Sequence, residues 1–169
     1  MSSVLEAELL AHLDSQIASA RTLLALVLEQ GKAIRARDVD AVLARLTDVQ
    51  TEMGRRGALE QDRAGLLQRA GVALGVPAAQ VTLERLCALV TPGAATTARE
   101  RSGELRGLLA EIAREHGINR ALMRQELSFL AHLTRLVGQE TEPGYGRPGD
   151  TGGSAAAPPP LHRALDLQA

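Results

Sequence analysis

Residues 9–27 read LLAHLDSQIASARTLLALV, and the spacing of their apolar positions decides the fold class. Apolar side chains recur every three or four residues, the period that places them along one face of an α-helix. The members of this stripe are Leu9, Leu13, Ile17, Ala20, Leu24 and Val27. The pattern predicts a first helix from Ser3 to about Arg37.

A second helix is expected after Asp38, because aspartate suits the N-cap position. Its apolar stripe is predicted to run through Val39, Val42, Leu46, Val49 and Met53. Two glycines follow in the segment Gly54-Arg55-Arg56-Gly57. Each glycine inside a helix costs about 1 kcal/mol relative to alanine, so we expect a bend there and not a break. The helix should end at Gly75-Val76-Pro77.

Two further helices are predicted. A short one covers about Pro77 to Val90, with its leucines turned inward, and Thr91-Pro92-Gly93 ends it. A long one runs from about Ala95 to Val137, with Gly138 as the residue after its end. The predicted fold is therefore all-α: an elongated antiparallel bundle of three long helices plus one short helix.

The composition changes abruptly after Glu140, where glycine, proline and alanine dominate. Such a segment has too few large apolar side chains to form a packed core. We therefore predict two parts, a helical domain over residues 1–139 and a flexible, disordered C-terminal tail over residues 140–169.

The composition also limits the function. Phe129 and Tyr145 are the only aromatic residues, and a core without rings favours long helices packed through Leu, Val, Ile and Ala. The net charge is −1, from 19 basic and 20 acidic residues that are interspersed. A nucleic-acid partner would need a concentrated basic face, so none is expected. The single Cys87 lies in an apolar stretch and is predicted to be buried and unreactive.

The sequence contains no pattern that would support catalysis. We find no phosphate-binding loop, no nucleophile elbow and no metal-ligand spacing among the histidines and the single cysteine. We therefore predict a protein that is not an enzyme and has no cofactor or metal. The first residues are acidic where a signal peptide is basic, and no apolar stretch is long enough to span a bilayer. A cytoplasmic location without stable membrane insertion is expected.

The second half of the last predicted helix carries more apolar surface than one neighbouring helix can cover. From residue 118 onward it includes Ile118, Leu122, Met123, Leu127, Phe129, Leu130, Leu133, Leu136 and Val137. Burial of each large side chain is worth roughly 1.5–3 kcal/mol. Either other helices of this chain bury these residues, or a partner helix docks on them.

The segment NRALMRQELSFL, residues 119–130, resembles the FlgN family of flagellar export chaperones. In that family an Asn precedes a Leu pair and a Leu-x-Phe-Leu-like group, and a Tyr with a Gly four residues later follows, as Tyr145 and Gly149 do here. Upstream positions also fit the family: Leu24, Gln30, Lys32, Ala33, Ile34, Asp38, Glu60, Arg63 and Leu67. The resemblance extends over nearly the whole chain to Gly149.

This resemblance implies a cytoplasmic chaperone of flagellar type III protein export. Such chaperones hold the C-terminal helical segments of the hook-associated proteins that form the hook–filament junction, prevent their premature assembly and deliver them to the cytoplasmic domain of the export gate. Carried over by position, the client-binding residues would be Asn119, Leu122, Met123, Leu127, Leu130 and Leu133. Tyr145 would contact the export gate.

Two other functions fit the same residues. The chain could be a generic coiled-coil adaptor whose apolar surplus forms a homodimer interface, and then its mass in solution would depend on concentration. It could also be a small helical subunit or regulator of an enzyme, although it lacks a pocket-forming motif.

Overall fold

The computed structural model describes residues 2–139, and all regular elements within them are helical. The long helices are α1 (Ser2–Ala36), α2 (Val39–Leu74) and α4 (Pro92–Gln139), while η1 (Ala78–Gln80) and α3 (Leu83–Cys87) connect α2 to α4. Among the described residues, those up to His132 form one compact unit, and the end of α4 from Leu133 belongs to a second. The predicted all-α class with three long helices is confirmed.

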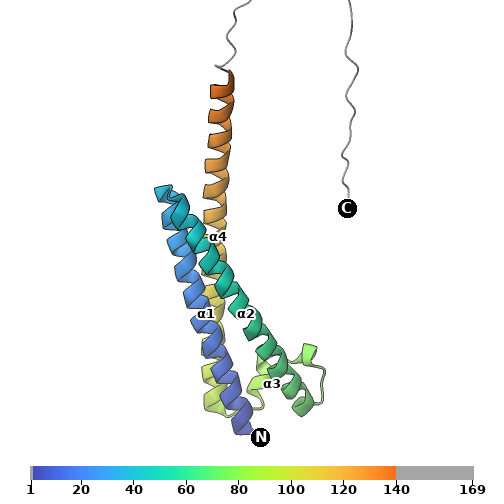
Figure 1. Cartoon of the computed structure of the whole chain (residues 1–169). Helices are drawn as coiled ribbons and strands as arrows, with labels where there is room; N and C mark the ends of the chain where they lie inside the picture. Colours follow the sequence, from blue (N-terminus) through green and yellow to red (C-terminus); the bar gives the residue numbers. More distant parts are fainter. Residues whose placement is uncertain (1, 140–169) are drawn as a thin grey trace, which may run out of the picture. The chain divides into compact units, whose positions relative to one another are not determined.

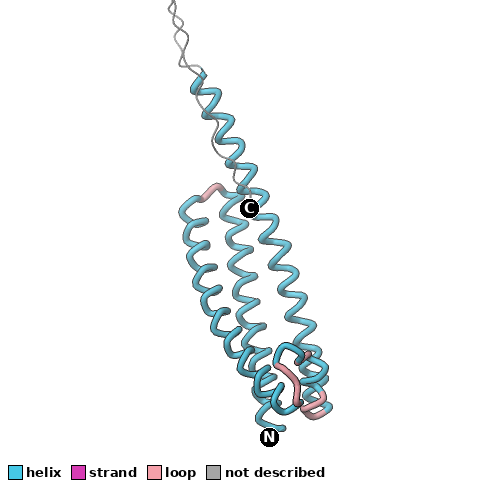
Figure 2. The backbone as a smooth tube through the Cα atoms, turned by 90° about the vertical axis from the view of Figure 1, so that its right-hand side faces the viewer, coloured by secondary structure: helices cyan, strands magenta, loops and turns pink. Residues whose placement is uncertain are grey.

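Side-chain pairs give the direction of α2 relative to α1. Arg69, near the end of α2, donates to the Glu8 carboxylate near the start of α1 at 2.9 Å. Ser19 donates to Glu52 at 2.6 Å, so later residues of α1 meet earlier residues of α2. The two helices are therefore antiparallel, and Figures 1 and 2 show them side by side.

The first part of α4 runs in the same direction as α1. Arg101 pairs with Asp14 at 2.9 Å, and further along both helices Asn119 donates to the backbone oxygen of Val27 at 2.8 Å. Within residues 2–132 the three long helices thus alternate up, down and up, as the predicted bundle requires.

The apolar stripe predicted for the first helix is the buried face of α1. Leu9, Leu13, Ile17, Ala20 and Val27 are all buried. The exception is Leu24, which is only half-buried while its neighbour Leu23 is buried in its place. One long amphipathic face therefore holds α1 against both other long helices.

A tight two-residue turn joins α1 to α2. Arg37 adopts a left-handed conformation with φ 56°, its backbone N–H donates to Ile34 O at 3.0 Å, and Asp38 N–H donates to Ala33 O at 3.0 Å. This is the Schellman arrangement that satisfies the last carbonyls of a helix. The Asp38 carboxylate then accepts a hydrogen bond from Ala41 N–H at 2.9 Å. The predicted N-cap is confirmed.

The stripe predicted for the first half of α2 is right only in part, because Val42 and Val49 alone are half-buried. Val39, Leu46 and Met53 are exposed, and Glu52 is buried instead. The face of α2 that is turned towards the other helices is offset by about one residue from the predicted stripe. This face includes polar side chains, so apolar periodicity alone did not predict it. Through Gly54 and Gly57 the helix continues without a break, as predicted.

The expected single helix from Pro77 to Val90 is also wrong, because two short pieces occupy this segment. Gly75 ends α2 in a left-handed conformation, with φ 67°, as expected. After η1, the Thr82 side chain accepts a hydrogen bond from Arg85 N–H at 3.3 Å and starts α3. The Thr82 hydroxyl caps the N-terminus of α3 and so divides the segment, which apolar spacing alone predicted to be one continuous helix.

The last helix begins three residues earlier than predicted. Pro92 is its first residue, a position where the missing N–H has no helical partner to lose. Thr91 accepts a backbone hydrogen bond from Ala95 at 2.9 Å and a side-chain one from Ala94 at 3.4 Å. The Thr-Pro-Gly segment is thus a helix start, and the preceding helix α3 already ends at Cys87. At the other end α4 passes Gly138 and ends at Gln139.

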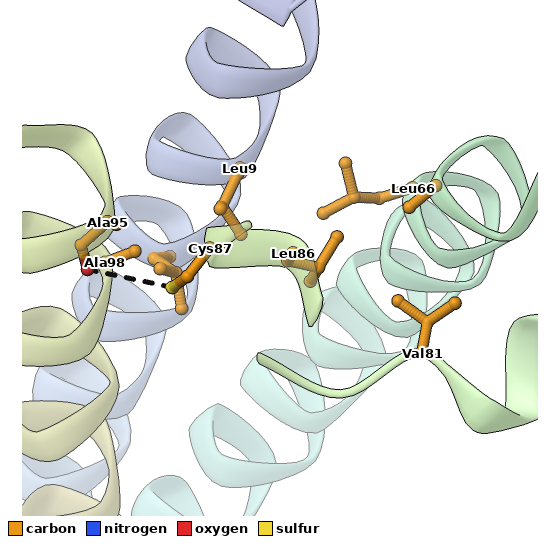
Figure 3. Close-up of a cluster of buried hydrophobic side chains, with 9 residues drawn as sticks. Leu9, Leu66, Val81, Leu86, Cys87, Ala95 and Ala98 are labelled. Atoms are coloured by element: carbon orange, nitrogen blue, oxygen red, sulfur yellow. Dashed lines mark hydrogen bonds between the residues drawn. The ribbon is translucent and has the colours of Figure 1, made fainter. Parts of the chain in front are cut away.

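The main hydrophobic cluster lies where α1 begins and α2 ends (Figure 3). Its buried members come from every helix except η1, together with Val81 beside it: Leu9, Leu13, Leu66, Ala70, Val81, Leu86, Cys87, Ala95 and Ala98. Small side chains from α4 face larger ones from α1 and α3. This packing anchors the three long helices to one another at one end of the unit formed by residues 1–132.

Candidate functional site: an apolar groove

An apolar groove lies at the other end of α1 from this cluster. It is formed where α1 ends and α2 begins, beside α4. It encloses about 400 Å³. Its lining comes from three helices and the turn between two of them: Ile34, Arg37, Val39, Val42, Leu43, Met123, Glu126, Leu127, Phe129 and Leu130. We refer to this set as the apolar groove.

The apolar groove has a buried base and exposed walls. Ile34 of α1 is 7% exposed, whereas Val39 of α2 is 67% exposed. On α4, Leu127 is 66% exposed and Leu130 is 55% exposed. Phe129, the chain's only phenylalanine, is exposed on the same helix. Large apolar side chains exposed together on α2 and α4, over a buried base from α1, are typical of a surface that binds a partner.

One ion pair crosses the apolar groove. Arg37 donates to Glu126 at 3.4 Å; the Arg37 side chain is largely exposed and the Glu126 side chain is partly exposed. An exposed pair of this kind contributes at most about 1 kcal/mol, so an incoming partner can displace it at little cost. The remaining lining is aliphatic or aromatic, and recognition here must rest on shape and apolar contact.

The structure brings some of the predicted client-binding residues together and separates others. Met123, Leu127 and Leu130 line the apolar groove. Leu122 is half-buried and is not part of the lining. Leu133 is exposed but belongs to the second unit. Tyr145, predicted to contact the export gate, lies outside the described residues.

Asn119 differs most from the expectation that it lines a client surface. Its side chain is 1% exposed, and its amide donates to Val27 O in α1 at 2.8 Å. A polar side chain buried between helices can fix their register. In this structure Asn119 is not exposed to contact a client.

Sequence reasoning missed the half of the apolar groove formed by α1 and α2. The position of Ile34 in the first helix indicates an ordinary core residue. Val39 was assigned to the buried stripe of the second helix. Leu43 lies outside that stripe, so no role was predicted for it. The only available signal was the short connection at Arg37 and Asp38, which forces the end of α1 and the start of α2 to lie close together.

The described residues give no sign of a metal or nucleophile site. Over residues 2–139, no group of three or more His, Cys, Asp or Glu side chains is placed to hold a metal ion. Cys87 is buried, as predicted, and its thiol lies 3.7 Å from Ala95 O. Desolvation by the surrounding apolar side chains raises the pKa of this thiol, which disfavours the reactive thiolate.

Among the helices in the described part of the chain, none is both long and apolar enough to cross a membrane. The long helices instead carry charged residues along their exposed faces, many in pairs such as Arg63 with Glu60 at 2.8 Å.

Comparison with known families identifies the chain. The model of the family described as FlgN protein matches residues 1–153. The chain belongs to the FlgN family. The match covers most of the 169 residues and confirms the resemblance found in residues 119–130. This family is one of flagellar chaperones, not of known enzymes. No curated protein and no solved structure matches the chain.

Proposed function

We propose that this FlgN-family protein is a cytoplasmic export chaperone that holds the C-terminal helical segments of hook–filament junction proteins in the apolar groove. The observation that carries the proposal is the groove itself, with exposed Val39, Leu127, Phe129 and Leu130 on converging helices. An amphipathic client helix would place its apolar face against these residues. Holding the client in this way would prevent premature assembly until delivery to the type III export gate.

The energetics suit a chaperone that must release its client. Each large side chain that becomes buried contributes roughly 1.5–3 kcal/mol. A client segment that folds on binding gives up about 2–5 kcal/mol or more to ordering. The net affinity is therefore moderate, and no nucleotide is needed to release the client.

The direct test is calorimetric titration of the full chain with a peptide from the C-terminal end of the organism's own hook–filament junction proteins. We expect micromolar or tighter binding. Leu127→Asp combined with Leu130→Asp should weaken binding at least about a hundredfold, because two buried apolar contacts are lost. Both side chains are exposed in the free protein, so the helical circular dichroism should persist.

A matched control is Met53→Asp. Met53 lies mid-helix in α2, is 53% exposed and is not part of the groove lining. It should leave the affinity unchanged. If the folded wild-type chain binds no client peptide and its mass by light scattering rises with concentration, the apolar groove is instead a homodimer interface, and the chaperone proposal is wrong.

We also propose that Tyr145 contacts the cytoplasmic domain of the export gate, on the strength of the family resemblance. Tyr145→Ala should reduce capture of that domain by the client-loaded chaperone, while the affinity for the client peptide stays unchanged. Tyr145→Phe separates the ring from its hydroxyl. Equal capture by wild type and Tyr145→Ala would contradict this assignment without affecting the groove.

A further inference from the structure

Asn119 and Gly31 form an unusually close contact between α4 and α1. Asn119 is one of only two large side chains, in the described part of the chain, with less than 2% of their surface exposed. Its Nδ2 donates to Val27 O at 2.8 Å. A carbonyl in the middle of a helix has a second lone pair available, so this bond adds to the helical bond that α1 makes there.

Gly31 makes the approach possible. A Cβ atom added at this position would lie 2.6 Å from Asn119 Oδ1 and 3.4 Å from Asn119 Cγ. Real Cβ atoms essentially never come so close to another heavy atom, so any larger residue would push α4 away or expel the amide. Glycine weakens a helix interior, and here the close contact gives a reason for its presence.

The contact fixes the position of α4 along α1 as well as the distance between them. Apolar side chains tolerate small sliding movements, but a hydrogen bond to one backbone oxygen does not. A shift by one residue, about 1.5 Å along the axis, would separate Asn119 Nδ2 from Val27 O and press the amide against a neighbouring side chain. A single buried asparagine sets helix register in coiled coils by the same physics.

The apolar groove begins directly after this contact. Met123 and Leu127 follow Asn119 by four and eight residues, so they lie one and two turns further along nearly the same face of α4. Ile34, the base of the groove, follows Gly31 by three residues. Any change in the spacing of the two helices at Gly31 is therefore passed to the groove walls.

We propose that the Gly31–Asn119 contact sets the spacing and register of α1 and α4 and thereby the width of the apolar groove. Asn119 is then a positioning residue, which acts on a client through Met123 and Leu127 without touching it. The link to client affinity rests on the proposed function, whereas the link to helix spacing does not.

The test uses the full chain in a Cys87→Ala background, with nitroxide labels on cysteines introduced at the exposed positions Ala25 of α1 and Arg124 of α4. Pulsed electron resonance gives the distance distribution between the labels. Titration with the junction-protein peptide gives the affinity of each variant.

Gly31→Ala should move the mean label distance outward and weaken peptide binding about tenfold. Asn119→Ala should broaden the distribution without an outward shift, because it removes the hydrogen bond and introduces no clash. The double change should return the mean distance to the wild-type value and recover most of the affinity. A residue that only adds stability would not show this reciprocal recovery.

Gly117→Ala is the matched control, because it is a helical glycine of α4 with nothing within 4 Å of an added Cβ. It should change neither readout. An unchanged label distance in Gly31→Ala, or no recovery in the double variant, would overturn the proposal. If Gly31→Ala does not fold, the breadth of the distribution in Asn119→Ala decides the question, and a width equal to wild type refutes it.

The two proposals fail separately. If the wild-type chain binds no peptide, the proposed function is wrong, and the label distances still decide whether Gly31 and Asn119 set the helix spacing. If the peptide binds and the distances do not respond, only the positioning role is lost.

Discussion

His12 is a half-buried titratable residue between α1 and α2. Gln16 lies beside it, with Nε2 atoms 3.4 Å apart, and donates to Glu60 at 3.4 Å. Desolvation lowers the pKa of His12 below its ordinary value of 6.5, more than the nearby Asp62 and Glu60 carboxylates raise it. The folded protein therefore binds this proton less tightly than the unfolded chain does.

This shift predicts a pH dependence of stability. The free energy of unfolding should fall as the pH drops below about 6.5, where the unfolded chain takes up the His12 proton first. His12→Gln should remove the part of the slope that begins as the pH falls below about 6.5. Urea denaturation followed by circular dichroism at several pH values measures it, and an identical slope in the variant would contradict the prediction.

Carboxylates contribute to the pH dependence of stability in a separate, more acidic range. A hydrogen bond from Arg63 holds the pKa of Glu60 below its ordinary value of 4.5. Stability from this group is present above that value and is lost as the pH falls through the folded pKa. The slope below about pH 4.5 should therefore survive in His12→Gln, which makes it an internal control.

Individual residues show how far sequence reasoning reaches at this scale. Cys87 was predicted to be buried from its apolar neighbours, and it is. Glu52 could not be predicted, because a charged residue is buried only where partners exist, here Ser19 at 2.6 Å and Arg55 at 3.3 Å. Asn119 was expected from the family resemblance to contact a client, whereas its hydrogen-bond partner Val27 lies in α1, 92 residues away.

At the scale of helices, the turn between α1 and α2 depends on Asp38. Asp38→Ala should lower the free energy of unfolding by about 1 kcal/mol, since the N-cap hydrogen bond to Ala41 is lost. Asp38→Asn keeps an accepting oxygen and should retain most of the stability. Chemical denaturation of both variants checks this. Equal losses in both would show that the charge near the helix N-terminus matters more than the cap.

Helix ends were predictable where a single residue type determines them. Asp38 and Gly75 mark the start and end of α2 as expected, because capping is a local interaction. Pro92 was misread as a stop, since proline is equally suited to the first turn of a helix. The phase of α2 was misjudged because polar residues occupy part of its inward face.

At the scale of the whole chain, we predict a domain boundary near residue 139. The segment that follows this boundary lies outside the described residues. Brief trypsin treatment should cleave at Arg163, in the Gly/Pro/Ala-rich segment, well before it cleaves at Arg135 within α4. Mass spectrometry of early fragments identifies the sites. Cleavage at Arg135 as fast as at Arg163 would contradict a domain boundary at residues 139 and 140.

The sequence by itself determined the helical class, the number of long helices, the inward face of α1 and the family. These properties follow from local periodicity, capping and residue order, which a linear chain displays directly. Only the tertiary structure decided that Asn119 is buried against Gly31 and that Ile34, Val39 and Leu127 share one groove. The physical reason is that contacts across helices depend on their relative rotation and register, which no single stretch of sequence specifies.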